Sequence, residues 1–270
     1  MINKILILVF ILSLFSCEKK EIEYYPNGGM FKTYKLKSNK IEGDFTVFYP
    51  NGNIKETHKF KEGVLIDSSI YYNQKKQINE IDYHFKDKSS FGKIFKNNIL
   101  NSEGRYYSSQ KRGKWKYYDG NGKLKRIFEY IDLCGKQYTN QDWSFDIKGN
   151  LIKKFRYEHC YTLSMQKNNF KVNEVINLNI VYKPILFKNS NSIIYMSPKI
   201  DRTFCNLNNV KLDSIYSVNH NFDIKLSFST TGNKNLRGYI KEFYDKKVDE
   251  KDSTTHGETF IYFDIPIKVE

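Results

Sequence analysis

Apolar and polar side chains alternate along most of this chain, and no long segment places apolar residues at helical spacing. Between residues 221 and 229, Phe222, Ile224 and Phe228 fall on one face of an extended strand. The final stretch, 260–269, repeats this alternation with isoleucine. Alternation with a period of two is typical of a strand that buries one face. The pattern therefore predicts an all-β protein.

A turn motif recurs through the first half of the chain. Tyr25-Pro26-Asn27-Gly28 returns 24 residues later as Tyr49-Pro50-Asn51-Gly52, and weaker copies follow at 72–75, 118–122 and 146–150. Each copy stands between two alternating segments. Asn-Gly accepts the positive φ that primed two-residue hairpin turns require. We therefore predict a sheet of stacked β-hairpins, because one hairpin cannot bury its apolar face alone.

The stretch from Ile81 to Tyr107 departs from this pattern. It has no Asn-Gly turn, and Gly92 and Gly104 do not match the glycines of the other copies. The register of the strands is open at this stage.

The repeated unit, Gly-x-Trp/Phe-x-x-Tyr followed by Asn-Gly, resembles the MORN repeat in its antitoxin-like bacterial variant. The resemblance covers residues 24–157, and the residues that carry it are Gly113, Trp115, Tyr117, Tyr118, Asn121 and Gly122, then Gly43, Phe45, Tyr49, Asn51 and Gly52. It implies a scaffold for protein assembly or phospholipid contact without catalytic residues. A toxin–antitoxin role does not suit an exported chain, and we do not carry it over.

The second half has strands of a different style. The polar segment 161–169 is expected to be a linker, and about seven alternating strands follow it. They predict an immunoglobulin-like β-sandwich; the alternative is that they continue the first sheet. The expected organisation is a signal peptide at 1–16, a lipidated tether at 17–23, hairpin repeats at 24–160 and the sandwich at 161–270.

The N-terminus indicates export. Lys4 precedes an apolar run from Ile5 to Phe15, which is too short to span a membrane of about 30 Å but suits a signal peptide. The run ends in Ser16-Cys17, which resembles a bacterial lipobox. That resemblance implies cleavage before Cys17 and lipid attachment to its thiol. We expect a lipoprotein of the bacterial cell envelope, in the outer membrane; an ordinary signal peptide is the alternative.

The formal net charge of +14 raises the question of an anionic partner. The lysines are spread through polar strand positions instead of forming a block, and the expected export argues against nucleic acid. Acidic lipid headgroups and anionic polysaccharides stay open as ligands.

Three cysteines follow Cys17, namely Cys134, Cys160 and Cys205. In an oxidising compartment we expect Cys134 and Cys160, which lie at similar places in successive repeats, as a candidate disulfide. Cys205 would then be free and buried.

The sequence contains no recognisable catalytic motif, metal site or cofactor site. Two pairs come nearest to a reactive arrangement, Asp142 with Asp146 and His159 with Cys160. We expect both pairs to be structural. The candidates for ligand contact are the aromatic residues Trp115, Tyr117, Tyr118 and Trp143.

Two functions are consistent with the sequence. The first is a non-enzymatic scaffold that is anchored to a membrane by its lipid and binds a protein partner in the envelope. The second is a binding module for an anionic glycan or a phospholipid surface.

Overall fold

The computed structural model describes residues 18–153, 158–186, 190–246 and 255–270. The expected signal peptide and Cys17 lie outside these residues. The described chain is all-β, as the alternating pattern predicts, with one short 3-10 helix, η1 (Leu207–Asn209). None of its described helical segments has the length and apolar character that a membrane crossing would need.

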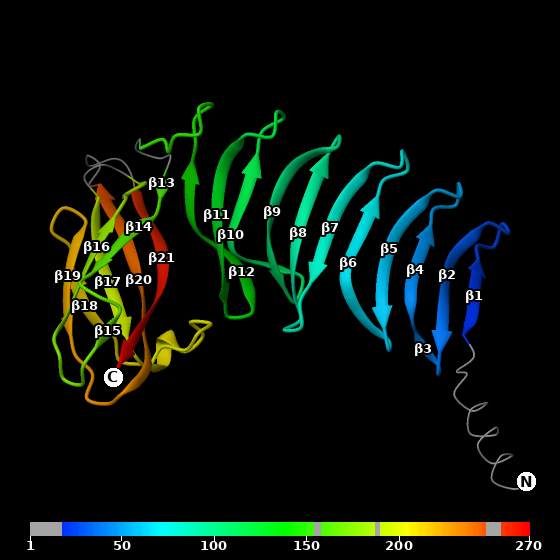
Figure 1. Ribbon diagram of the computed structural model, residues 1–270. Helices are drawn as coiled ribbons and strands as arrows, with labels where there is room; N and C mark the ends of the chain where they lie inside the picture. The colour runs from blue at the N-terminus through cyan, green and yellow to red at the C-terminus, as the bar shows by residue number, and fades with distance from the viewer. Residues whose placement is uncertain (1–17, 154–157, 187–189, 247–254) are drawn as a thin grey trace, which may run out of the picture. The chain divides into compact units, whose positions relative to one another are not determined.

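The chain divides into two compact units. Unit 1 comprises residues 1–109 and 120–122, and unit 2 comprises 110–119 and 123–270. An antiparallel sheet of 13 strands follows the chain order, with β3 beside β2 (Figure 1). Its strands in unit 1 are β1 (Lys19–Tyr24), β2 (Met30–Lys37), β3 (Lys40–Ile41), β4 (Gly43–Phe48), β5 (Ile54–Lys61), β6 (Val64–Tyr72), β7 (Ile78–His84), β8 (Ser89–Lys96) and β9 (Ile99–Tyr107).

The Tyr-Pro-Asn-Gly motif forms a bulged turn instead of the predicted two-residue primed turn. The Tyr25 N–H donates to the Gly29 carbonyl at 2.7 Å and the Gly28 N–H donates to the Tyr25 carbonyl at 2.9 Å. Gly28 takes a φ of +83°, and Asn27 Oδ1 accepts the Gly29 N–H at 3.2 Å. This is the three-residue loop with a left-handed glycine and a bulge. The same hydrogen bonds recur at 49–53, 73–77 and 85–89, where Gly52, Lys76 and Lys88 take the left-handed position.

Primed turns occur instead where the sequence carries no Asn-Gly. Ser38 and Asn39 have φ values of 49° and 60°, and Glu62 and Gly63 have 53° and 80°. Two successive positive φ values define the type I′ turn. Because consecutive hairpin turns lie at alternate ends of the strands, bulged turns occupy one end of β1–β7 and primed turns occupy the other.

The irregular stretch 81–107 is a place where the two turn types exchange ends. By the alternation of the earlier turns, a primed turn is expected between β7 and β8, but a bulged turn at 85–89 joins them. The next connection, from β8 to β9, is a primed turn at Asn97-Asn98, whose φ values are 53° and 62°. Strand β8 pairs with β7 without a register shift and with β9 through one irregularity between Ile94 and Phe95, and Gly92 lies opposite Gly104. The sequence departs from its repeat here because the type of turn at each end of the strands changes, whereas the strands continue the same sheet.

A tyrosine at the start of each of the first two bulged turns links its hairpin to the next. The Tyr25 hydroxyl donates to the Phe48 carbonyl at 2.7 Å, and the Tyr49 hydroxyl donates to the Tyr72 carbonyl at 2.7 Å. Each bond spans 23 residues, close to the repeat length. The repeated tyrosine is therefore explained by nearest-neighbour stacking of hairpins.

Unit 1 is a single layer of sheet with an aromatic face, which we define as Tyr34, Phe45, His58, Phe60 and Tyr71. Their rings contact one another across β2, β4, β5 and β6, at centroid distances of 5.4–6.5 Å. Among the described hydrophobic residues of this unit, Val47 alone is buried. The aromatic face is therefore half-buried by its own side chains and carries no second layer.

Unit 2 contains the rest of the first sheet and two further sheets. The remaining strands of the first sheet are β10 (Gln110–Tyr118), β11 (Leu124–Leu133), β12 (Lys136–Ser144) and β13 (Glu158–His159). The second sheet has the order β14 (Tyr161–Met165), β16 (Ile176–Tyr182), β19 (Asn221–Leu226). The third has the order β15 (Asn169–Phe170), β21 (Thr255–Val269), β20 (Gly232–Lys246), β17 (Asn191–Ser197), β18 (Asp213–Tyr216).

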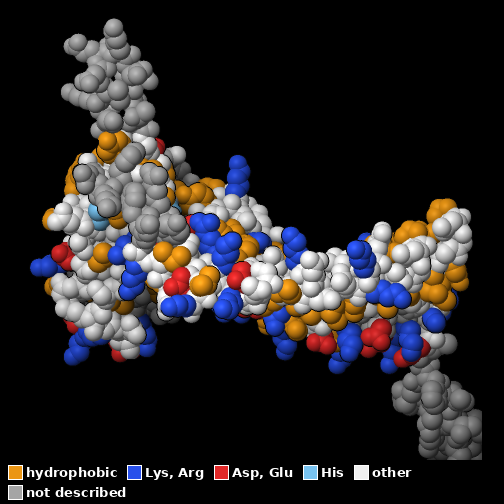
Figure 2. All heavy atoms as spheres, turned by 90° about the horizontal axis from the view of Figure 1, so that it is seen from above, with side chains coloured by type: hydrophobic (Ala, Val, Ile, Leu, Met, Phe, Trp, Pro, Cys, Tyr) orange, Lys and Arg blue, Asp and Glu red, His pale blue; other side chains and the backbone are white. Residues whose placement is uncertain are grey.

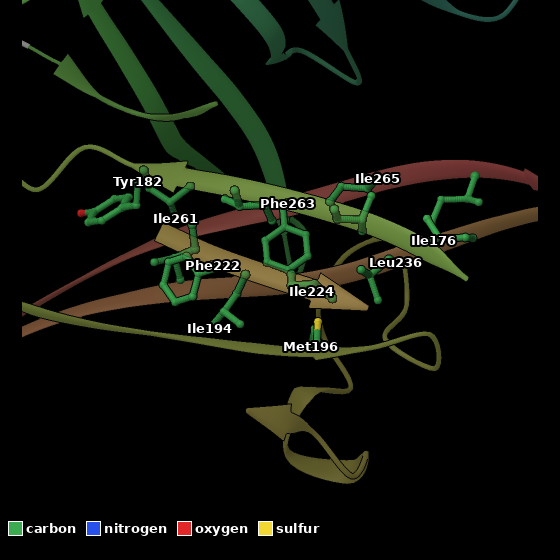
Figure 3. Packing of buried hydrophobic residues seen from close by; sticks show 14 of the residues in the cluster. Ile176, Tyr182, Ile194, Met196, Phe222, Ile224, Leu236, Ile261, Phe263 and Ile265 are labelled. Atoms are coloured by element: carbon green, nitrogen blue, oxygen red, sulfur yellow. The ribbon is translucent and has the colours of Figure 1, made fainter. Parts of the chain in front are cut away.

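The second and third sheets form a sandwich around the main core of the molecule. Ile176 and Phe222 from one sheet, and Ile194 and Ile261 from the other, have no exposed surface. Figure 3 shows these side chains between the strands, with Phe263 among them. Alternate residues of β16, β19 and β21 are buried, which is the pattern that the sequence predicts for these strands.

Within unit 2, side chains of β12 form hydrogen bonds that connect the first sheet to the sandwich. The Asn140 amide donates to the Tyr262 carbonyl at 2.8 Å and accepts the Tyr262 N–H at 2.7 Å. The Tyr138 hydroxyl donates to the Phe260 carbonyl at 3.0 Å. Asn140 thus satisfies backbone groups of β21 that no strand pairs at this point.

Two expectations about organisation need correction. The predicted linker at 161–169 contains β14, which pairs with β16. The predicted tether at 17–23 is largely β1, which pairs with β2 from Lys19 onward. The alternative in which the later strands continue the first sheet is excluded, because they form separate sheets. The strands of the first sheet end at His159, and those of the second sheet begin at Tyr161. The boundary between the two compact units lies elsewhere, before Gln110.

Candidate functional site

The four aromatic residues proposed for ligand contact do not form one surface. Trp115 has no exposed surface, and Lys111 Nζ covers its ring at 4.3 Å. Tyr117 is half-buried and its hydroxyl contacts that of Tyr130 at 2.8 Å. Trp115 is therefore a packing residue of unit 2, because a ligand cannot reach its ring.

Trp143 lies on the opposite face of the sheet from Trp115. Trp115 pairs with Phe128, whereas Trp143 pairs with Ile127, the neighbouring residue of β11. Adjacent residues of a strand point to opposite faces. Lys114 Nζ lies 4.7 Å from the Trp143 ring, and Tyr118 is half-buried.

The disulfide differs from the expected pair. Cys134 bonds Cys205, with the Cα atoms 4.9 Å apart, and Cys160 is free and buried. Cys134 begins the hairpin turn before β12, while Cys160 follows β13, which pairs with the far end of β12. The two predicted partners therefore lie at opposite ends of one strand. The Cys134 N–H also donates to the Thr203 carbonyl at 2.9 Å, which holds the segment of Cys205 against the turn.

The residues of the two candidate reactive pairs, Asp142 with Asp146 and His159 with Cys160, have structural roles. Asp142 forms an ion pair with Arg126 at 3.0 Å, and Asp146 accepts the N–H groups of its own turn from Lys148 and Asn150. Burial raises the pKa of the Cys160 thiol to about 12, so this thiol is protonated at neutral pH.

A second polar cluster lies inside the sandwich around Glu242, which has no exposed surface. Its carboxylate accepts the Tyr182 hydroxyl at 2.7 Å, the N–H groups of Ile185 and Leu186 at 3.0 Å each, and the Ser190 hydroxyl. Four donors from the protein fill its acceptor positions. This cluster therefore stabilises the fold instead of offering groups to a ligand.

Unit 1 contains a groove that the sequence does not predict. It has a volume of about 960 Å³, within the range of roughly 300–1,000 Å³ that is typical of small-ligand sites. Its lining comes from the start of β6, from β7, from the turn to β8, and from the end of β9 and the turn after it. Polar lining residues include Glu80, Asp82, His84, Ser90 and Tyr106.

Gly92 determines the shape of the groove floor. Asp82 and Gly104 pair with Gly92 from its two sides. A Cβ at Gly92 would lie 2.6 Å from Tyr106 Cε2 and 2.8 Å from Asp82 Oδ1. The side chains of Asp82 and Tyr106 therefore lie over the glycine backbone. Asp82 Oδ1 is shielded from solvent and has no hydrogen-bond partner among the described residues, and burial raises the pKa of this carboxyl.

A chain of hydrogen bonds leads from β5 to His84 in the groove. Glu56 Oε2 lies 3.2 Å from His58 Nε2. His58 Nδ1 lies 2.7 Å from Ser69 Oγ, and Ser69 Oγ lies 2.7 Å from His84 Nε2. Ser69 has no exposed surface, so its hydroxyl acts between the two imidazoles and is closed to a substrate.

The residues of this groove were missed because they are far apart in the sequence and belong to no local motif. His58 and His84 are separated by 26 residues, close to one repeat, and they lie on the second strands of successive hairpins. The repeat period could therefore have placed them on one face. The exchange of turns at 81–107 hid this relation.

Among the described residues, no three His, Cys, Asp or Glu side chains gather closely enough to hold a metal ion. The groove instead combines hydrogen-bonding groups of several kinds with the aromatic side chains of Phe85 and Tyr106.

No family model matches the chain, and no curated protein matches it at a significant level. The resemblance to MORN repeats and to lipoproteins accordingly stays a prediction from the sequence.

Proposed function

We propose that this chain is an envelope lipoprotein, anchored through lipid on Cys17, that acts as a non-enzymatic scaffold for a protein partner. The observation that carries the proposal is the single-layer sheet of unit 1. The rings of its aromatic face contact one another from β2 to β6 and are only half-buried. Contiguous apolar surface of this kind marks interaction sites.

The sandwich of unit 2 supplies a second module, which we assign to the immunoglobulin-like class. β16 and β19 are neighbours in one sheet, and β21, β20 and β17 are neighbours in the other. This order supports the assignment, since immunoglobulin domains pair their strands in the same way. The class describes the fold and supplies no function by itself.

The scaffold proposal is tested by affinity capture from solubilised envelopes with the lipidated, C-terminally tagged chain. One partner recovered in near-equal amount is the expected result. Tyr34→Ala and Phe60→Ala, on the aromatic face, should reduce its recovery. Tyr216→Ala removes an aromatic residue of unit 2 that is 70% exposed, and it should not. Equal recovery with all three variants, each with an unchanged circular dichroism spectrum, would contradict the proposal.

Lipidation is tested separately. Cys17→Ser should release the chain from the membrane fraction and abolish incorporation of a labelled fatty acid. Membrane association that survives this change, with no label in the wild-type chain, would remove the anchor from the proposal.

The second candidate is binding to an anionic glycan or a phospholipid surface, favoured by the net charge of +14. Figure 2 shows Lys and Arg side chains spread over the face it presents, with hydrophobic and acidic side chains between them. Such binding should weaken as the ionic strength rises. Vesicle or polymer binding that ignores salt would exclude the charge-driven version.

A further inference from the structure

We propose that the turns at one end of the strands of unit 1 bind an anionic polysaccharide through lysines that no acidic group neutralises. This surface, which we call the lysine rim, comprises the turns at 49–53, 73–77 and 96–98 (Figure 1). The inference rests on the second candidate function and deepens it, because it names the polymer and the place where the polymer binds.

The three turns of the lysine rim are neighbours. They follow β4, β6 and β8, and β4 to β9 lie side by side in the sheet, so all three turns lie at the same end of the strands. The Asn53 side-chain amide donates to the Gln74 carbonyl at 3.0 Å, which joins the first turn to the second. Successive turns are separated by two inter-strand distances, about 10 Å. A linear polymer that runs across the strands can therefore contact all three.

The positive charge of the rim is not compensated. Its three lysines are exposed, and their ammonium groups have no ion pair or hydrogen bond with any described residue: Lys75, Lys76 and Lys96. The three turns contain no Asp or Glu. On the strand after the first turn, Glu56 is ion-paired with Lys55 at 2.8 Å. On the strand after the second turn, Glu80 lines the groove. A polyanion that approaches the rim therefore meets attraction without a carboxylate that repels it.

The opposite end of the strands of unit 1 has no such excess, because acidic residues stand among its lysines. The Glu42 carboxylate accepts the Glu62 N–H at 2.7 Å, which places two acidic residues together at this end. Asp87 belongs to the turn at 85–89. The two ends therefore differ in charge, and the rim is the end that suits an anion.

Lys76 occupies a position where a side chain strains the backbone. Its φ is +63°, and the corresponding positions of the first two bulged turns are filled by Gly28 and Gly52. A left-handed backbone disfavours residues other than glycine, and strain of this kind is concentrated at functional sites. Lys88 has the same φ at the opposite end, where Asp87 precedes it. Lys76 differs because its neighbour is a second lysine instead of an acid.

The chemistry of the rim favours a polysaccharide over a protein or a membrane. The side-chain amides of Gln74, Asn97 and Asn98 are exposed and have no partner among the described residues, so they can donate to and accept from hydroxyl groups. Lysine is depleted at the cores of protein interfaces. β1 begins two residues after Cys17, at the end of the strands opposite the rim. A lipid on Cys17 therefore directs the rim away from its own membrane.

The test measures binding of the purified lipidated chain, in micelles of a non-ionic detergent, to polygalacturonate, with dextran as the neutral polymer. We expect saturable binding of polygalacturonate that weakens as the salt concentration rises, and no binding of dextran. The rim variant carries Lys75→Glu, Lys76→Glu and Lys96→Glu together. It should bind polygalacturonate about tenfold more weakly or worse, because three attractions become repulsions.

A matched variant carries Lys37→Glu, Lys40→Glu and Lys61→Glu at the opposite end. These lysines are also exposed and without a partner among the described residues, so the net charge changes equally. The matched variant should keep the affinity of the wild-type chain. Lys76→Gly should weaken binding severalfold without lowering the thermal midpoint of unfolding, because glycine suits the left-handed backbone. A lysine with only a structural role would not show this separation.

The proposal is overturned if the rim variant and the matched variant bind equally, or if dextran binds as well as polygalacturonate. Vesicles of phosphatidylglycerol test the other anionic surface. Binding of these vesicles through the rim, without binding of polygalacturonate, would overturn the polysaccharide and assign the rim to a lipid surface.

Failure of the rim is distinguishable from failure of the functions proposed above. Polygalacturonate binding that the rim variant retains would leave the second candidate function standing and remove the rim from it. A wild-type chain that binds neither polygalacturonate nor the vesicles would overturn both. The rim variant leaves the aromatic face unchanged, so its capture of a protein partner should equal that of the wild-type chain.

Discussion

Single residues control the shape of the groove and the attachment of one loop. At Gly92 the space that a side chain would need is taken by Tyr106 and Asp82. At Cys134 a disulfide joins the β11–β12 turn to the segment that contains Cys205. Each of these residues makes a prediction about stability.

Gly92→Ala should destabilise unit 1 by about 1–3 kcal/mol, because the new methyl group displaces a packed ring or a carboxylate. The measurement is the urea midpoint of the variant. Gly120→Ala is the matched control, since nothing lies within 4 Å of a Cβ at that position. Equal midpoints for the two variants would show that the groove floor adapts freely.

Cys134→Ser should lower the free energy of unfolding by about 2–4 kcal/mol, because the disulfide closes a loop with a sequence separation of 71 residues. Thiol titration of the unfolded variant should reveal Cys205 as a new free thiol. Cys160→Ala removes a buried thiol that forms no disulfide and serves as the control. A wild-type chain in which Cys134 titrates as a thiol would refute the pairing.

The residue scale was the hardest to predict. Trp115 and Trp143 were chosen because aromatic rings bind ligands, yet strand parity places them on opposite faces and packing buries the first. Asp82 and His84 could not be chosen, because their significance depends on partners two strands away. Local sequence contains no information about the hydrogen bond between Ser69 and His84.

At the scale of elements, the turn tyrosines account for how hairpins stack. Tyr49→Phe removes the hydroxyl that donates to the Tyr72 carbonyl and should cost about 0.5–1.5 kcal/mol in unfolding free energy. Tyr24→Phe alters a neighbouring tyrosine that is 61% exposed and should be close to neutral. Thermal unfolding followed by circular dichroism compares the two, and equal midpoints would remove the tyrosine from the stacking account.

Asn140→Ala should be more costly, by about 2–3 kcal/mol, because it leaves both backbone groups of Tyr262 without partners inside unit 2. Hydrogen exchange at the Tyr262 amide is the direct readout. Protection that persists in the variant would mean that another group has replaced the asparagine.

Strands were easier to predict than turns. Alternation located β16, β19 and β21 because burial of one face leaves a period of two in the sequence. The Asn-Gly turns were assigned the wrong type, since the same dipeptide also fits a bulged turn with a left-handed glycine. Glu62 and Ser108 adopt positive φ without a sequence signal, because the twist of the adjoining strands imposes it.

For the whole molecule, partly buried histidines link stability to pH. Burial lowers the pKa of His159 and of His220, as it does for His84. The unfolded chain then binds more protons than the folded chain once the pH falls below about 6.5, the ordinary value for histidine. Stability should therefore decrease between about pH 6.5 and pH 5, before carboxylates with lowered pKa values begin to protonate.

Urea midpoints measured across this range should fall as the pH falls. His159→Gln cannot gain a proton and should flatten the decline relative to the wild-type chain. A midpoint that is constant over the range would contradict the assignment of neutral, partly buried histidines.

The bonds made by Tyr25 and Tyr49 have a consequence for the history of the chain. Both residues begin an identical four-residue motif and make the same bond to the following hairpin. Unequal crossing-over between the two copies would excise residues 25–48 and leave a junction with the same chemistry. Such a gene can lengthen or shorten its product one hairpin at a time, so the span of the sheet is open to selection without a new fold.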